Sequence, residues 1–151
     1  MPRCRRYPGL AHRLVVERGD DGITFIDDAY NSNPAGFQSA LDVLSKLRGL
    51  RKILITPGMV ELGERHDDEH RIIARRAAEV CDVILLVAPE RIEAFCQGLL
   101  ENHFPQDHIH RFASLHEARK WLNQNIRAQD VVLFENDLPD LYEEPRAFRI
   151  L

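Results

Sequence analysis

A stretch of polar residues at positions 27–34 is the part of this sequence best equipped for chemistry. Asp27 and Asp28 are adjacent carboxylates, and the amide side chains of Asn31 and Asn33 follow within five positions. Carboxylates accept hydrogen bonds from sugar hydroxyls, and amides pair with peptide-like groups. Asn33 before Pro34 is typical of a helix start, where unpaired backbone N–H groups favour anions. The stretch therefore suits a polar ligand, although residues of this kind also fill ordinary turns and helix caps.

Further polar loops follow apolar runs in the same manner, at residues 57–63, 88–90 and 135–140. In an open parallel sheet, ligands bind beyond the carboxyl ends of the strands. We therefore expect these loops and residues 27–34 to meet at one edge of a sheet.

The elements that must position these loops alternate between strands and helices. Strands are expected over 13–17, 23–26, 52–56, 83–87, 110–112 and 131–134, and helices over 33–49, 67–80, 92–100 and 114–122. This alternation predicts a three-layer, Rossmann-like α/β fold with a mainly parallel sheet and helices on both faces. The turn at 20–22 adds a candidate N-terminal antiparallel hairpin, and Gly49 is expected to close the first helix. Structure-breaking residues before position 12 predict a linker over 1–11, followed by one domain over 12–151.

Composition excludes several classes of protein. The chain has 151 residues and a formal net charge of -4. The slight acidity argues against nucleic-acid binding, and no apolar run approaches the roughly 20 residues of a membrane helix. The cysteines are odd in number and show no paired spacing, so reduced thiols in the cytoplasm are expected, with Cys81 and Cys96 packed in the core.

Three ordered segments resemble the C-terminal domain of the Mur ligases. The run D-D-A-Y-N-S-N-P at 27–34 resembles the family signature D-D-x-Y-N-A-N-P. The run G-M-V-E-L-G at 58–63 resembles the G-D-M-x-E-L-G segment, and His70 stands on the following helix where the family has a histidine. His12-Arg13 resembles the pair that opens the domain. The resemblance spans residues 9–135 and is strongest to the members that add D-alanyl-D-alanine.

The resemblance implies part of an ATP-dependent amide-bond ligase of peptidoglycan precursor synthesis. In the family, ATP phosphorylates a carboxylate of a UDP-linked muramoyl peptide, and an amine then attacks the acyl phosphate. The positions that the resemblance places toward the nucleotide are Arg13 and Asp28. Those toward the amine are Tyr30, Asn31, Ser32 and Asn33. Candidate loop contacts are Glu61, His70, Glu135, Asn136 and Asp137. No catalytic residue and no metal ligand is assigned.

These residues include no G-x-x-x-x-G-K-[ST] phosphate loop. In the family, ATP and Mg²⁺ are held mainly by a central domain, and the UDP group is held by an N-terminal domain. We therefore expect this chain to be inactive alone and to need both domains as partners. A truncated ligase is the favoured interpretation; a subunit of a two-chain ligase and a stand-alone Rossmann-like module that binds a small ligand are the alternatives.

Two loops depart from the family pattern. Gly58 stands where the family has the aspartate of G-D-M, and the acidic stretch 135–140 replaces a basic K-G-S-R-type loop. An acidic loop disfavours a second substrate that carries a carboxylate. We therefore expect an amine other than D-alanyl-D-alanine, or a different mode of binding it. His66 and His70 have the i, i+4 spacing of a zinc pair, but a solvated helix start explains them more simply.

Overall fold

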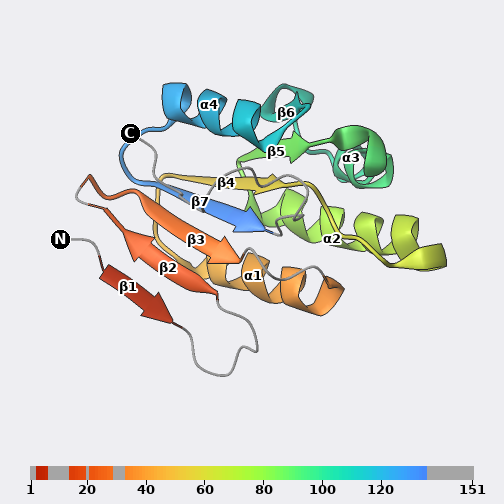
Figure 1. The fold of residues 1–151 in the computed structure, drawn as a ribbon, viewed down its shortest axis with the longest axis horizontal. Helices are drawn as coiled ribbons and strands as arrows, with labels where there is room; N and C mark the ends of the chain where they lie inside the picture. Colours follow the sequence, from red (N-terminus) through yellow and green to blue (C-terminus); the bar gives the residue numbers. More distant parts are fainter. Residues whose placement is uncertain (1–2, 7–13, 20, 29–32, 136–151) are drawn as a thin grey trace.

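The sheet of the computed structural model places its last strand near the middle (Figure 1). The described residues are 3–6, 14–19, 21–28 and 33–135. Their strands are β1 (Arg3–Arg6), β2 (Val15–Arg18), β3 (Thr24–Asp28), β4 (Arg51–Thr56), β5 (Val83–Val87), β6 (Ile109–Phe112) and β7 (Asp130–Glu135). The order across the sheet is β1-β2-β3-β7-β4-β5-β6. Strands β3, β7, β4, β5 and β6 run parallel to one another, whereas β2 is antiparallel to both β1 and β3.

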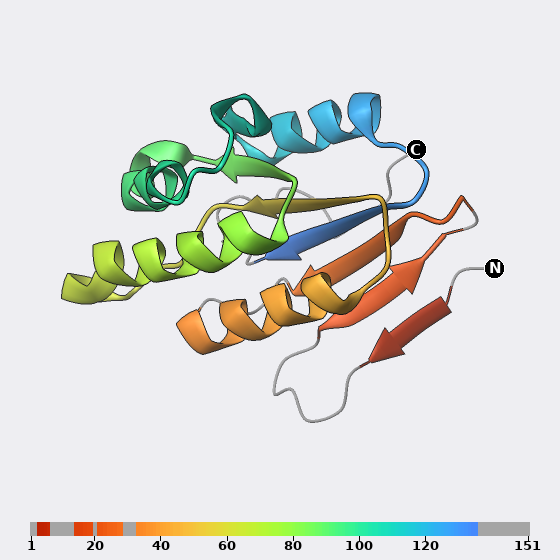
Figure 2. The ribbon, with the colours of Figure 1, turned by 180° about the vertical axis from the view of Figure 1, so that it is seen from behind.

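Four helices cover the sheet, as the sequence predicts. They are α1 (Pro34–Lys46), α2 (His66–Val80), α3 (Glu93–Glu101) and α4 (Leu115–Asn125), and short 3₁₀ turns form η1 (Gly63–Arg65), η2 (Pro89–Arg91) and η3 (Gln106–His108). Helices α1, α2 and α3 lie on one face and α4 on the other (Figures 1 and 2). After β6 the chain passes through α4 and returns to β7 in the middle of the sheet. This connection crosses the sheet in the direction opposite to the connections from β4 to β5 and from β5 to β6, so its right-handed crossover places α4 on the opposite face. The predicted three-layer fold and its antiparallel hairpin, β2–β3, are confirmed.

Two apolar cores follow from the alternation of side chains along the central strands. Leu54 of β4 and Leu133 of β7 join the core beneath α1, α2 and α3, whereas Ile53 and Val132 join the core beneath α4. All five residues of β5 are buried, as expected for a strand covered on both faces. Among the described residues, no helix has the length and apolar character that crossing a membrane requires.

Local sequence explains where the helices begin. The Asn33 side chain accepts a hydrogen bond from the Gly36 amide at 2.8 Å, and Pro34 occupies the first turn of α1. The Ser114 hydroxyl accepts from the Glu117 amide at 3.2 Å and so caps α4. The helix starts expected from the sequence at residues 33 and 114 are confirmed.

Two local predictions differ from the structure. Residues 3–6, within the predicted linker, form strand β1, which pairs with β2. Helix α1 ends at Lys46 with Leu47 as its C-cap, so Gly49 does not close it. A Cβ on Gly49 would lie 2.4 Å from Cγ2 of Val131 and 2.8 Å from the Gln129 carbonyl oxygen, so the glycine permits the close approach to β7.

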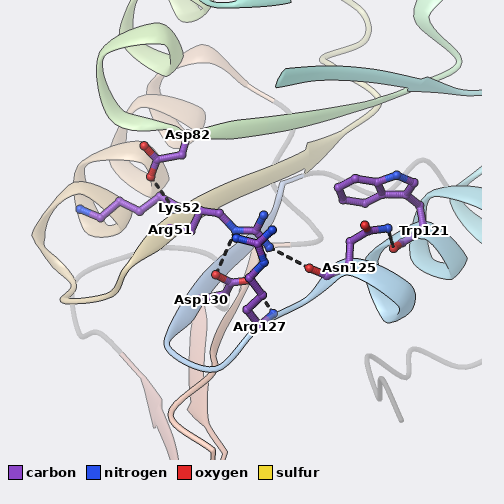
Figure 3. Close-up of polar contacts among 7 residues, drawn as sticks. All are labelled: Arg51, Lys52, Asp82, Trp121, Asn125, Arg127 and Asp130. Atoms are coloured by element: carbon purple, nitrogen blue, oxygen red, sulfur yellow. Dashed lines mark hydrogen bonds and ion pairs between the residues drawn. The ribbon is translucent and has the colours of Figure 1, made fainter. Parts of the chain in front are cut away.

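The amino edge of the sheet is held by an ion pair between the first residues of β4 and β7 (Figure 3). Arg51 donates to both carboxylate oxygens of Asp130, at 3.1 and 2.8 Å, and also to the Asn125 carbonyl at 2.9 Å. Asp130 is 1 % exposed and also accepts the Arg127 amide at 2.9 Å. This edge is therefore cross-linked by opposite charges within the chain.

Candidate functional site at the carboxyl edge of the sheet

The carboxyl ends of β3 and β7 bring two carboxylates side by side. Asp28 and Glu135 are paired in the parallel register, 107 positions apart in the sequence (135 − 28). Asp28 is 1 % exposed and Glu135 is not exposed. Side chains alternate along a strand, so Asp28 shares the α1–α3 face with Ile26, and Glu135 shares it with Leu133. The structure thus joins two of the predicted site residues at the edge where parallel sheets bind ligands.

Helix α1 begins at this same edge, directly after β3. Its N-terminal backbone N–H groups and partial positive charge favour an anionic or electron-rich ligand group. Asn33, a predicted substrate contact, uses its side-chain oxygen to cap the helix. Other predicted positions lie outside the described residues, namely Arg13, Tyr30, Asn31, Ser32, Asn136 and Asp137. Their assignments stay predictions.

The turn after β4 forms the next part of this edge. The buried Thr56 hydroxyl accepts the Gly58 amide at 2.9 Å. Gly58 has a φ of +88°, in the left-handed region that favours glycine. Arg91 of η2 donates to the Pro57 carbonyl at 3.1 Å. Thr56 and Arg91 were not among the predicted site residues, because nothing in the local pattern shows that their side chains bind backbone groups of this turn.

His70 is buried beneath the turn and does not face solvent. It is 0 % exposed, its Nε2 accepts the Met59 amide at 2.9 Å, and its Nδ1 lies 2.7 Å from the His66 carbonyl oxygen. Burial lowers the pKa of His70 by desolvating the charged form, which outweighs the opposing effect of the hydrogen bond to His66. Both ring nitrogens are engaged by backbone groups, which leaves neither of them for the zinc pair considered from the sequence.

Glu61 occupies the exposed part of the loop that leaves this turn. Its φ is 60°, and Gly63, two residues on, also has a φ of 60°. A glutamate in the left-handed region is uncommon, so this conformation depends on the surrounding loop. The structure therefore presents Glu61 to solvent, while His70 holds the start of the same loop from inside.

The arrangement offers several groups that can bind a polar ligand. Carboxylates at the strand ends and the start of α1 supply acceptors and oriented N–H groups for a polar ligand. Among the described residues, no three histidine, cysteine or acidic side chains are grouped as a metal site would require. Cys81 and Cys96 are buried as predicted, and burial raises the pKa of the Cys81 thiol.

Comparison with known families identifies one match over most of the chain. Residues 12–135 match the family described as Mur ligase, glutamate ligase domain. The chain is similar to the UDP-N-acetylmuramoyl-tripeptide–D-alanyl-D-alanine ligase of Bacillus subtilis, with 25 % identity over 88 % of this chain and 31 % of the relative. The enzyme of the same name from Treponema pallidum shows 26 % identity over 88 % of this chain and 28 % of the relative. The chain therefore spans less than a third of the length of these curated relatives.

Solved structures give the same picture. The MurF ligase from Thermotoga maritima in complex with ADP has a TM-score of 0.62 and 27 % identity, over 81 % of this chain and 26 % of that one. MurF from Acinetobacter baumannii has a TM-score of 0.63 and 25 % identity, over 80 % of this chain and 26 % of that one.

Proposed function

The chain belongs to the Mur ligase family, as its C-terminal glutamate ligase domain, and we propose that it closes over the nucleotide and the amine substrate of an ATP-dependent amide-bond ligase. The family match over residues 12–135 carries this proposal. The junction of Asp28, Glu135 and the start of α1 at one sheet edge supports it, because ligands of such sheets bind there. ADP in the Thermotoga maritima relative also supports nucleotide use by the whole enzyme.

We propose a division of labour between this chain and two further ligase domains. Asp28 accepts a ribose hydroxyl, and its burial strengthens that hydrogen bond. Arg13 lies toward the nucleotide, and residues 30–33 lie toward the amine. ATP, with its Mg²⁺ held mainly by a central domain, would supply the phosphoryl group that activates a muramoyl-peptide carboxylate. Closure of this chain over the site would exclude water from the reactive acyl phosphate. Alone, the chain would then be inactive.

We further propose that the amine is not D-alanyl-D-alanine, or that it is bound differently than in the relatives. Glu135, at the end of β7, stands where the family carries a basic loop, and it lies in register with Asp28. Two acidic side chains disfavour a substrate carboxylate and favour a cationic group. A ligation assay with a panel of amines tests this, and a clear preference for D-alanyl-D-alanine would overturn it.

A domain-exchange experiment tests the proposed function itself. The chain replaces the C-terminal domain of the Bacillus subtilis relative in one arm, and in a second arm it is mixed with the first two domains of that enzyme. Ligation is followed as ADP release that depends on both the muramoyl peptide and an amine. We expect activity from the fusion above that of the first two domains alone. Activity in the mixture as well would indicate a two-chain ligase, and no gain in either arm would contradict the proposal.

Asp28→Ala in the active fusion examines the nucleotide role. We expect the KM for ATP to rise about tenfold or more, because a hydrogen bond to a charged group contributes about 1.5–3 kcal/mol. Asp21→Ala is the matched control, since Asp21 is an exposed turn residue that precedes the opposite end of β3. An unchanged KM for ATP would remove Asp28 from the nucleotide site.

A further inference from the structure

The turn that follows β4 is bound from inside by the buried imidazole ring of His70. The Met59 amide points its N–H at Nε2 of His70, 2.9 Å away, and the other ring nitrogen lies 2.7 Å from the His66 carbonyl oxygen. His70 belongs to α2, whereas Met59 belongs to the loop that enters η1 and α2 from the sheet. The ring therefore ties the exit of a central strand to the first turn of the next helix.

The partners of the ring determine its protonation state. A backbone amide can only donate, so Nε2 of His70 must be an unprotonated acceptor. A carbonyl oxygen can only accept, so Nδ1 must carry the proton and donate to His66. His70 is therefore neutral and in the Nδ1–H tautomer. A proton on Nε2 would set two N–H donors against each other inside a buried contact.

The neighbouring residues close tightly around this contact. A Cβ on Gly58 would lie 2.9 Å from Nε2 of His70 and 2.4 Å from Cγ2 of Ile92. Phe95 of α3 meets the His70 ring edge-on, with centroids 6.4 Å apart. Arg91 binds the Pro57 carbonyl from the other side of the turn. The turn thus has little freedom while the hydrogen bond to His70 persists.

We propose that His70 is a positioning residue that fixes the turn 57–59, and with it the direction in which the loop carrying Glu61 leaves the sheet. This inference rests on the proposed function, because it makes that loop part of the ligand-binding edge. His70 itself touches no substrate. It acts through the Met59 amide, and its contribution requires the neutral ring.

The charged groups around the ring set the acid sensitivity of this contact. His66 and Asp67 face it from α2, and Arg91 faces it from η2, while residues 57–59 bring no charged side chain. His66 and Arg91 disfavour a second positive charge, and Asp67 favours it. Because burial dominates, the ring stays neutral at pH 7, and acid below pH 6.5 protonates it and releases the turn.

Two substitutions separate the two hydrogen bonds of the ring. The side-chain oxygen of His70→Gln reaches the position of Nε2 and can accept the Met59 amide. The amide nitrogen of His70→Asn reaches only the position of Nδ1 and can donate to His66. In the 151-residue chain, we expect hydrogen exchange of the Met59 amide to speed up about tenfold in His70→Asn and to change little in His70→Gln. His110→Asn is the matched control, since His110 stacks on Trp121 with centroids 4.5 Å apart and lies near α4.

Nitrogen-detected NMR of the imidazole rings examines the tautomer directly. We expect the Nδ1–H form of His70 at pH 7 and its loss, together with the protection of Met59, on acidification. An Nε2–H tautomer would overturn the proposal. Equal Met59 exchange in His70→Asn and the unsubstituted chain would overturn it as well.

Ligation by the fusion enzyme distinguishes positioning from simple structural support. We expect His70→Asn to lower kcat/KM about tenfold or more, as small misplacements of a binding loop do, and His70→Gln to restore most of it. The part of the acid limb that comes from His70 should be lost in His70→Gln. Unchanged kcat/KM in His70→Asn would overturn the positioning role while leaving the proposed function intact. An inactive fusion with the expected NMR response would count against the proposed function alone.

Discussion

Strand β7 allows a comparison of the two edges of the sheet, because it begins at one and ends at the other. Its first residue, Asp130, is in register with Arg51, and its last residue, Glu135, is in register with Asp28. The first pair combines opposite charges that bond at 2.8 Å (Figure 3), and the second combines two acidic side chains. Asp130, Glu135 and Asp28 are all at most 1 % exposed.

The difference separates a structural role from the proposed binding role. The opposite charges at the amino edge bind each other and two backbone groups, so they stabilise the fold without a ligand. Asp28 and Glu135 are instead two buried acidic side chains in register at the ends of adjacent strands. Local conflicts of this kind are expected at functional sites. The comparison therefore supports the proposal that the carboxyl edge binds the ligand.

The largest effect on stability should come from the amino edge. Asp130→Ala leaves Arg51, whose side chain is 19 % exposed, without its carboxylate and removes the acceptor of the Arg127 amide. We expect a loss of about 3–5 kcal/mol in the free energy of unfolding, as for other broken buried ion pairs. Urea unfolding of the chain measures it.

Arg76→Ala provides the control for this loss. Arg76 binds Asp42 and Glu79 on the surface, where these two side chains are 53 % and 56 % exposed, so about 0–1 kcal/mol is expected. If Asp130→Ala cost no more than Arg76→Ala, the structural role of the amino edge would be lost.

A smaller effect is expected at the turn of the carboxyl edge. Gly58→Ala places a methyl group against Ile92 and His70 at a φ of +88°, and we expect a loss of about 2–3 kcal/mol from strain and overpacking. Gly63→Ala is the matched variant, because its φ is +60° but no atom lies within 4 Å of the added group. It should cost about 1 kcal/mol. Equal losses, measured by urea unfolding, would show that the turn is not packed against His70.

The smallest effect is a dependence of stability on pH that originates at the carboxyl edge. Burial lowers the pKa of His70 below 6.5, so the unfolded chain binds this proton first as the pH falls. Stability should therefore decline as the pH drops below about 6.5 and should decline less in His70→Gln. Burial also lowers the pKa of His110, so this histidine makes a second contribution to the dependence of stability on pH. The variant His110→Gln measures that contribution. A pH profile of unfolding unaltered by His70→Gln would contradict the neutral, buried ring.

The sequence predicted the elements well, because each carries a local signal. The wholly apolar run at 83–87 and the caps at Asn33 and Ser114 depend on neighbouring residues only. The register that joins Asp28 to Glu135 depends on residues far apart in the sequence. The pairing of Arg51 with Asp130 across 79 positions does so as well. Periodicity predicts a strand but not its neighbours, so the expected meeting of loops at one edge could be stated and the individual pairs could not.

Strand β1 and the partner of His70 could not be predicted either, because both depend on residues distant in the sequence. Strand β1 is short and lies among residues that usually break structure, and its partner β2 decides its conformation. His70 lies at helical spacing with the buried residues Ile73, Ala74 and Ala77, which is the one sequence signal that it faces inward. That spacing does not reveal the Met59 amide as its partner, since the turn 57–59 reaches the ring only through the fold.

The place of β7 also dictates when this molecule can fold. As synthesis proceeds from the N-terminus, β3 and β4 emerge without the strand that separates them, because Asp130–Glu135 is made after every other described element. Before β7 is made, strands β1–β3 and strands β4–β6 can therefore form only two incomplete sheets with open edges. Insertion of the last strand joins the halves through contacts distant in sequence, which are the kind of contacts that slow folding.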